Sequence, residues 1–162
     1  MYESLWCIEV HYKYDRKVKG KHSYRSVSLH SMLVDQLRFP QYVEKIKAQG
    51  HERVFHDLDI ENYKFGSSFT EIFGHYLRKK VGITDSKKTF HSLRHNVSDH
   101  LYQKLVLDSL IEELHGRAGK TETRKRYTKG YRVHTLYKEC IEKLEYKVDL
   151  SHLRNSKYVQ KK

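Results

Sequence analysis

A chain of 162 residues with 38% hydrophobic residues is long enough for one domain with a core, and too short for two well-sized domains. Its 32 lysines and arginines outnumber 20 acidic residues, and the formal charge of +12 favours a polyanionic partner. Two cysteines without CxxC spacing argue against a disulfide framework or thiolate zinc site and favour a reducing, intracellular setting. No run of 18 apolar residues and no signal-like start is present, so we expect neither secretion nor membrane spanning.

The positive charge is concentrated in two basic strips, Lys13–Arg25 and Arg117–Arg132. The first holds six basic residues and one acid, and the second holds seven basic residues and one acid. A generic surface would spread its lysines evenly, so the two strips predict two places where a phosphate backbone is bound. Two solvated loops are the alternative interpretation.

A small antiparallel sheet is predicted for Trp6 to Leu29. Apolar and polar residues alternate from Trp6 to Tyr14 and again from Tyr24 to Leu29, which is the period of a half-buried strand. Lys19-Gly20-Lys21 lies between the two stretches, at or beside the turn of the hairpin. We therefore expect Lys19 to project from this hairpin.

Two helices are expected in the middle of the chain. Pro40 marks the start of the first, and Gly50 marks its end. The second carries a strong amphipathic stripe from Phe69 to Val81 and stops at Gly82, with Ser68 and Glu71 spaced as a capping box. Between the two helices, residues 52–65 look irregular.

Three further helices are expected towards the C-terminus. One runs from Phe90 to about Leu105, and another runs from Asp108 to Leu114, with Asp108 as its cap and Gly116 as its stop. The last is indicated by apolar residues from Val133 to Leu144. The chain thus has a mainly helical α+β pattern, with a domain over 1–153 and a flexible basic tail at 154–162.

The stretch Thr89-Phe90-His91-Ser92-Leu93-Arg94-His95 has the side chains for phosphate chemistry. His91 and Arg94 are three residues apart on a helical pattern and can project from one face. A histidine moves a proton near neutral pH, and the planar guanidinium of an arginine binds two phosphate oxygens. Arg126-Tyr127 follows in the second basic strip, so the order of residues suits a tyrosine nucleophile acting on a phosphodiester.

These residues resemble the tyrosine recombinases, or phage-type integrases, over Trp6 to Leu153. Val18-Lys19-Gly20-Lys21 resembles the hairpin with the family's catalytic lysine, and His91-Ser92-Leu93-Arg94-His95 resembles its HxLRH box. The segment Arg124-Lys125-Arg126-Tyr127-Thr128-Lys129-Gly130-Tyr131 resembles the one that bears the nucleophile, which makes Tyr127 the nucleophile rather than Tyr131. The resemblance implies the helical tyrosine-recombinase catalytic core, with the small sheet at its start.

The resemblance also implies a mechanism without cofactor or metal. Tyr127 attacks a DNA phosphate to form a 3′-phosphotyrosine, and His91 accepts its proton, since a phenol with a pKa of about 10 is a poor nucleophile at pH 7. Arg94 stabilises charge on the non-bridging oxygens, and Lys19 protonates the departing 5′-oxygen. The expected partner is double-stranded DNA, bound by a homotetramer in which the 145–162 segment docks onto a neighbour.

Eight further basic residues of the two strips are expected to lie along DNA. They are Lys17, Lys21, Arg25, Lys120, Arg124, Lys125, Arg126 and Lys129. The expected location is the cytoplasm, with the protein associated with a nucleoid and encoded by a bacterium or phage.

Two departures from the family pattern point to weak cleavage. The family has another arginine in a TGxR-like segment before the hairpin, and this sequence begins at Met1, just before the first strand. Losing one such cation costs roughly 10²-fold or more in rate. The family's LxGH box reads Leu114-His115-Gly116-Arg117, with an arginine where histidine is usual. Arg117 can still donate to a phosphate oxygen, and His115 is the lesser candidate, with a supporting role expected for it.

Other interpretations remain open for these residues. His91 and His95 have the spacing of a zinc pair, but the HExxH pattern needs a glutamate where Ser92 stands. We expect a structural role for His95 and no metal. An inactive DNA-binding remnant of a truncated integrase is the main alternative for the whole chain, and a basic RNA-binding protein is another.

Overall fold

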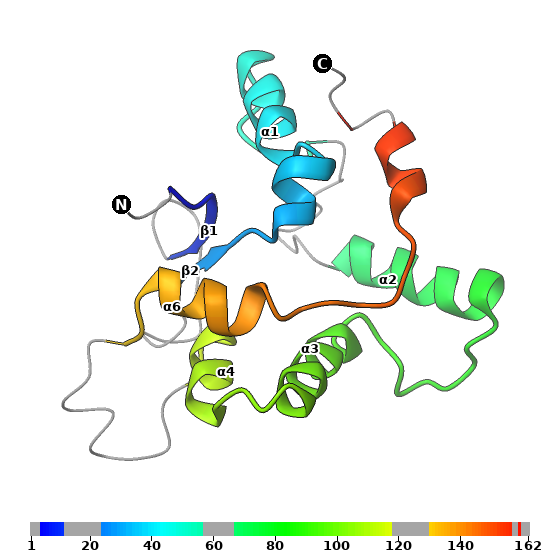
Figure 1. The fold of residues 1–162 in the computed structure, drawn as a ribbon. Coiled ribbons are helices and arrows are strands. Elements are labelled where there is room, and N and C mark those ends of the chain that lie inside the picture. The colour runs from blue at the N-terminus through cyan, green and yellow to red at the C-terminus, as the bar shows by residue number, and fades with distance from the viewer. Residues whose placement is uncertain (1–3, 12–23, 57–66, 118–129, 157–158, 160–162) are drawn as a thin grey trace. The chain divides into compact units, whose positions relative to one another are not determined.

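A two-stranded antiparallel sheet opens the fold, as the alternating pattern predicts. In a computed structural model, which describes residues 4–11, 24–56, 67–117, 130–156 and 159, β1 (Cys7–Val10) pairs with β2 (Arg25–Ser28) (Figure 1). The register runs from Cys7 opposite Ser28 to Val10 opposite Arg25, and the Leu29 N–H donates to the Trp6 carbonyl at 2.8 Å. The hairpin turn with Lys19 lies outside the described residues.

The chain divides into two compact units. One comprises 1–42 and 100–162, and the other comprises 43–99. The candidate residues of the sequence fall in both, so each unit is described by itself. Whether the two form the single domain expected over 1–153 stays a prediction.

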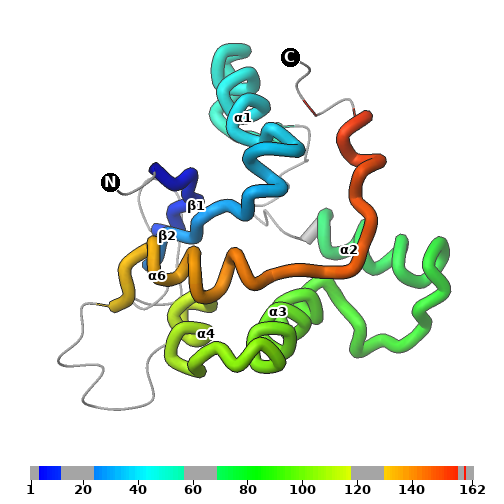
Figure 2. The backbone as a smooth tube through the Cα atoms, viewed as in Figure 1, coloured from blue at the N-terminus to red at the C-terminus, as the bar shows by residue number. Residues whose placement is uncertain are grey.

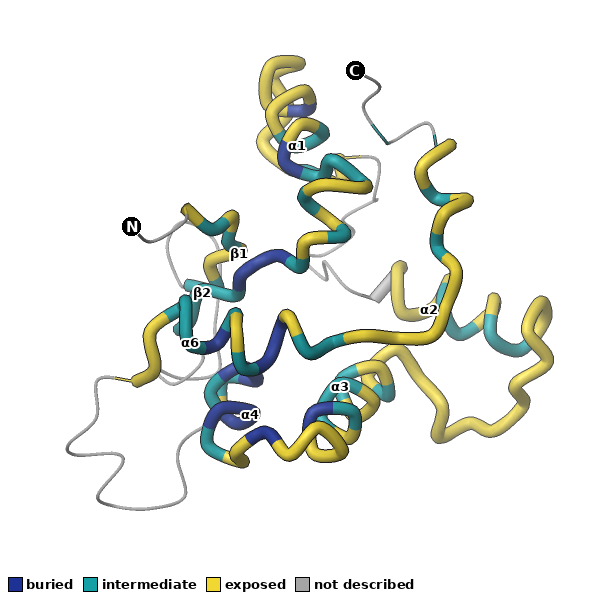
Figure 3. Tube along the Cα trace, in the orientation of Figure 1, coloured by how far each residue is buried: buried dark blue, intermediate teal, exposed yellow. Residues whose placement is uncertain are grey.

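The core of the first unit lies where β2 packs against three helical elements. These are α4 (Asp108–Leu114), α6 (Val133–Leu136) and the π-helical turn η5 (Tyr137–Ile141), which continues α6 (Figure 2). Figure 3 shows the buried positions gathered along these segments. Among the described residues of this unit, the buried apolar ones are Leu29, Leu101, Val106, Leu110, Ile111, Leu114, Leu136, Cys140 and Ile141. The helix expected from the Val133–Leu144 pattern is confirmed.

Helix α1 (Phe39–Ala48) follows the predicted bounds closely. Pro40 lies in its first turn, where a backbone N–H has no helical partner and a proline costs nothing. Gly50, with a φ of +83°, ends it by the Schellman arrangement, in which the Gly50 N–H donates to the Lys47 carbonyl and the His51 N–H to the Ile46 carbonyl. The π-helical turn η2 (Met32–Gln36) before it was not predicted, because five residues are too few to show a period.

Helix α2 (Ser67–Tyr76) and the π-helical turn η4 (Leu77–Val81) form the amphipathic element of the second unit. Gly82, with a φ of +79°, ends it as predicted. The helix already includes Ser68, so the predicted capping box is wrong in its register by at least one residue. Ile72 and Tyr76 on the apolar stripe are exposed, so the stripe is less buried than the sequence pattern indicates.

Helix α3 (Ser92–Gln103) is shorter than the predicted 90–105 span. Leu101 is fully buried, as the apolar period requires, but Leu105 lies beyond the helix and is 90% exposed. Leu105 has a φ of +57°, and its N–H donates to the Tyr102 carbonyl while the Val106 N–H donates to the Leu101 carbonyl. This Schellman ending turns Leu105 outwards and places Val106 in the core instead.

Helix α4 has the predicted bounds and the predicted stop, but not the predicted cap. Leu107 is its N-cap residue, so Asp108 lies in the first turn and interacts with the positive end of the helix dipole instead of capping it. Gly116 ends the helix with a φ of +66°, and its N–H donates to the Glu113 carbonyl. The glycine was a dependable signal because a left-handed residue is needed there.

Within the first unit, three contacts hold the C-terminal segment against the rest of the unit. His100 Nε2 donates to the Lys143 carbonyl at 2.9 Å, and the Tyr146 ring lies 4.9 Å from the His100 ring. The 3-10 turn η6 (Ser151–Asn155), which was not predicted, holds Arg154, whose guanidinium donates to the Gln36 side chain at 2.8 Å. Part of the region expected as tail from residue 154 is therefore in a regular turn.

The fold class is confirmed as mainly helical α+β, with helices making up most of the regular structure beside the two-stranded sheet. In the described part of the chain, no helix is both long enough and apolar enough to cross a membrane.

Candidate functional site

The start of α3 holds His91 and Arg94 in one tight turn. The Arg94 N–H donates to the His91 carbonyl at 3.1 Å, so the two residues are joined through their backbones. Two hydrogen bonds of Ser92 stabilise the same turn. Its Oγ accepts from the Thr89 N–H at 3.0 Å and donates to the Lys87 carbonyl at 3.4 Å. The two residues therefore share one turn of the second unit, and the expectation that their side chains project from one face stays a prediction.

An aromatic cluster fixes this turn against α2. The Phe90 ring meets the Phe69 and Phe73 rings edge to face, with centroids 4.9 Å and 5.3 Å away. Such pairs contribute about 0.5–1.5 kcal/mol beyond their buried area. The residue before His91 is thus held by packing while His91 itself is exposed.

Two imidazole rings meet in this turn, next to Arg94 in the sequence. His91 and His95 are exposed and their rings meet edge to face at 5.3 Å, while Arg94 is half-buried. An exposed imidazole can move a proton, and a guanidinium in the same turn has the chemistry to bind a phosphate oxygen. Among the residues that the structure describes, no group of three or more histidine, cysteine, aspartate or glutamate side chains could hold a metal ion.

The end of α4 separates the two candidates of the Leu114-His115-Gly116-Arg117 box. His115 is 8% exposed, whereas Arg117 is exposed. The Arg117 N–H donates to the Glu112 carbonyl at 2.8 Å, which completes the Schellman ending of α4. A ligand can reach Arg117 directly, but His115 would first have to leave the core.

Arg25 lies against Gly116. A Cβ placed on Gly116 would be 3.0 Å from Arg25 Cζ and closer still to its Nη1. Burial lowers the pKa of Arg25 from its usual value, because the charged form loses water. The last residue of the first basic strip therefore lies against Gly116, which directly precedes the second strip.

Tyr131 fixes the far end of the second strip to the same helix. Its N–H donates to Glu113 Oε1 at 2.6 Å, and its hydroxyl shares a 2.7 Å hydrogen bond with Ser109 Oγ. Gly130 has a φ of +85°, and a Cβ there would lie 2.5 Å from Glu113 Oε1. Both ends of the segment that contains Tyr127 are thus bound to α4.

Sequence reasoning missed Ser109, Glu113 and Gly130 as residues that position this segment. The two hydrogen bonds join residues 18 and 22 positions apart, and no periodicity reports such contacts. Gly130 alone gave a signal, since a glycine after a basic run often marks a left-handed residue.

The remaining predicted site residues lie outside the part of the chain that the structure describes. They are Lys17, Lys19, Lys21, Lys120, Arg124, Lys125, Arg126, Tyr127 and Lys129. Their roles stay predictions.

The chain was also compared with known proteins. No protein-family model matches it, and no curated protein or solved structure gives a significant match.

Proposed function

We propose that this chain acts in site-specific DNA recombination, cleaving and rejoining DNA strands through a 3′-phosphotyrosine. The support is an ordered set of residue types with a chemical role for each: Lys19, then His91 and Arg94, then Arg117, then Tyr127. The observation that carries most weight is the binding of both ends of the Tyr127 segment to α4, beside Arg117 and Arg25. A nucleophile gains from restraint because orientation lowers the entropic part of the barrier, and the described residues on either side of the Tyr127 segment are held.

The proposed step conserves bond energy. The Tyr127 oxygen forms a bond to phosphorus while the bond from phosphorus to the 5′-oxygen breaks, and the 3′-phosphate stays on the protein. The tyrosine proton passes to His91, and Lys19 gives a proton to the departing 5′-oxygen. Arg94 and Arg117 stabilise the charge on the non-bridging oxygens. The reverse of this step rejoins a 5′-hydroxyl and releases Tyr127.

Duplex DNA as partner and a cytoplasmic, nucleoid-associated location follow from the same proposal. So does a tetramer on DNA, in which the 145–162 segment reaches a neighbouring copy. The exposure of Arg117 and the burial of His115 favour Arg117 as the group that meets phosphate.

The test is a covalent-adduct assay. Duplexes are first enriched from a random pool by binding to the Tyr127→Phe protein. They are then synthesised with a single nick at successive positions, so that the short fragment with the released 5′-hydroxyl, between the cleavage site and the nick, dissociates and cannot rejoin. The wild-type protein is expected to give a slow-migrating adduct on a denaturing gel, and Tyr127→Phe to give none while it keeps duplex binding.

Tyr131→Phe is the matched control, because it also removes one hydroxyl and lies four residues away. It loses the hydrogen bond to Ser109, which contributes about 0.5–1.5 kcal/mol, but it should still form the adduct. An adduct that persists in Tyr127→Phe and disappears in Tyr131→Phe would move the nucleophile to Tyr131.

A second candidate function is DNA binding without cleavage. It is favoured by Arg117, an arginine in place of the histidine that the resemblance expects. Tight duplex binding without adduct at any nick position, in wild type and Arg117→His alike, would support it over recombination.

A further inference from the structure

The second unit carries a basic cluster that the two strips do not include. Its members come from two short stretches, the last turn of η4 and the segment that leads to α3. They are Arg78, Lys79, Lys80, Lys87 and Lys88, named here the 78–88 cluster. One acidic residue, Asp85, lies between them in the sequence.

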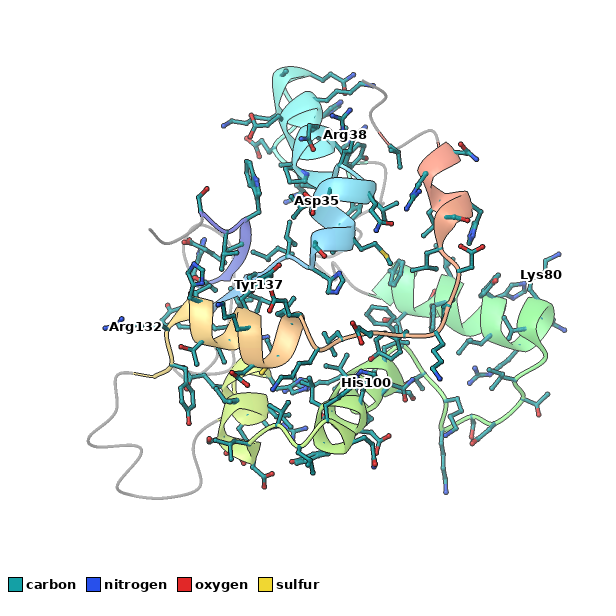
Figure 4. All side chains as sticks on the ribbon, in the orientation of Figure 1. Asp35, Arg38, Lys80, His100, Arg132 and Tyr137 are labelled. Carbon is teal, nitrogen blue, oxygen red and sulfur yellow. The ribbon has the colours of Figure 1, made fainter. Side chains whose placement is uncertain are left out.

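The fold brings the two stretches together. Gly82 is left-handed and reverses the chain after η4, where the Ile83 N–H donates to the Leu77 carbonyl at 2.9 Å. Arg78 Nη1 then donates to the Lys88 carbonyl at 3.0 Å, which ties the end of η4 to the returning segment. Figure 4 labels Lys80 at this end of the element that begins with α2.

The cluster has little internal neutralisation. Lys79, Lys80, Lys87 and Lys88 are all exposed, and no carboxylate in the described ranges pairs with any of them. Asp85 uses its Oδ1 to accept the Lys87 N–H at 2.9 Å. Several like charges held close together repel one another, and a polyanion that binds them relieves this cost.

The cluster is joined to the turn that holds His91 and Arg94. Ser92 is the first residue of α3, and its Oγ donates to the carbonyl of Lys87, a member of the cluster. The same Oγ accepts from the Thr89 N–H, so this side chain connects the cluster to the start of α3. A phosphate backbone bound by these lysines would therefore lie next to the same turn.

We propose that the 78–88 cluster binds the phosphate backbone of duplex DNA beside His91 and Arg94. The inference rests on the proposed function, which supplies DNA as the partner, and deepens it. Both basic strips belong to the unit of 1–42 and 100–162, whereas this cluster lies in the unit of 43–99. Each unit thereby has its own contact with the DNA backbone, and the unit with the HxLRH box is held on DNA directly.

The test compares three double variants that change the net charge equally. Lys79→Gln/Lys80→Gln and Lys87→Gln/Lys88→Gln remove two charges from the cluster. Lys45→Gln/Lys47→Gln is the control, because it removes two exposed lysines from the last turn of α1 in the same unit. Since Lys79 and Lys80 also lie in a last turn, the first pair and the control lose the same kind of helix-end interaction.

Binding to a fluorescein-labelled 20-base-pair duplex is measured by anisotropy over a range of salt concentrations, which suits a contact that does not depend on base sequence. Each lost phosphate contact lowers the slope of log affinity against log salt by about 0.9. We expect each cluster variant to lower the slope by about 1 to 2, with weaker binding at low salt, and the control to match wild type. Thermal unfolding of each variant checks that it is folded. If one cluster variant does not fold, the other is still compared with the control.

The results separate the inference from the proposed function. Cluster variants with the wild-type slope, in a protein that still forms the Tyr127-dependent adduct, would overturn the inference alone. Equal slopes for the control and the cluster variants would also overturn it, since net charge would then explain the loss. A wild-type protein that binds no duplex at any salt would overturn both.

Discussion

The Arg25 side chain lies so close to Gly116 that a methyl group added at Gly116 would require the end of the Arg25 side chain to shift. The Cδ atom of Arg25 would be 3.4 Å from a Cβ on Gly116, its Cζ 3.0 Å away, and its Nη1 nearer still. The contact joins β2 to the end of α4 and places the guanidinium against Gly116, the residue before Arg117. An arginine from the first basic strip therefore has a packing role as well as a proposed role towards phosphate.

Gly116→Ala is expected to destabilise the fold by about 1–3 kcal/mol, from two causes. An alanine at a φ of +66° costs roughly 1–2 kcal/mol, and its methyl group must also displace the Arg25 side chain. Gly82→Ala is the control, because Gly82 has a φ of +79° and open space around it, so only the backbone cost applies. Urea unfolding of both variants measures the difference.

The Arg25 contribution is isolated by a double-mutant cycle. In an Arg25→Ala background the methyl group added at position 116 has room, so Gly116→Ala should cost no more than Gly82→Ala does. Equal costs of Gly116→Ala with and without Arg25 would show that the close contact has no energetic effect.

The predictability of this fold from sequence differs between its parts for physical reasons. Gly50, Gly82 and Gly116 located three helix ends, because a left-handed residue at these positions needs no tertiary information. Leu105 ends α3 in the same left-handed conformation without a glycine, so the helix predicted from the apolar pattern was too long. The three ends marked by glycine follow from the local sequence, whereas the end of α3 coincides with the burial of Val106 in the core.

The candidate site was predictable in the same partial way. The three-residue spacing of His91 and Arg94 placed them in one turn, since the backbone alone determines that proximity. The hydrogen bonds of Tyr131 to Ser109 and Glu113 could not be read from spacing, because they depend on where α4 lies relative to a segment far along the chain. The 78–88 cluster has five basic residues and one acid within 11 positions, so the same charge count along the sequence could have found it. The contact of Arg78 with Lys88 could not be read in this way, because it forms only after the chain reverses at Gly82.

Leu105→Gly is expected to stabilise the protein by about 0.5–1 kcal/mol, although it removes a large apolar side chain. A leucine in the left-handed conformation destabilises the folded state by roughly 1–2 kcal/mol, and a glycine has no such cost. Part of this gain is offset because glycine makes the unfolded chain more flexible, which raises the entropy lost on folding. Leu105 is 90% exposed, so little buried area is lost. The melting temperature should rise by about 1–4 °C.

Leu105→Ala is the control for that substitution, because alanine shortens the side chain and keeps the left-handed cost. Its stability should stay within about 0.5 kcal/mol of wild type. A glycine variant no more stable than the alanine variant would mean that the backbone of Leu105 carries no strain.

Cys140 should make the stability of the protein fall between about pH 9 and pH 11. Its side chain is fully buried, and desolvation raises the pKa of the thiol from 9.0 to about 11. The thiol of the unfolded chain ionises first as the pH rises, so the contribution of Cys140 is complete below pH 9 and is lost on passing through pH 11. At pH 10.5 the loss is roughly 2 kcal/mol relative to pH 8, at 1.36 kcal/mol for each pKa unit.

The measurement uses a Cys7→Ser background, which leaves Cys140 as the single thiol. Urea unfolding at pH 8 and pH 10.5 is compared with the same protein carrying Cys140→Ala, because tyrosines and lysines titrate equally in both and cancel in the difference. The alanine protein is less stable at pH 8 because a buried side chain is shortened, yet it should lose roughly 2 kcal/mol less between the two pH values. Parallel losses in the two proteins would show that Cys140 ionises as freely in the folded state as in the unfolded chain.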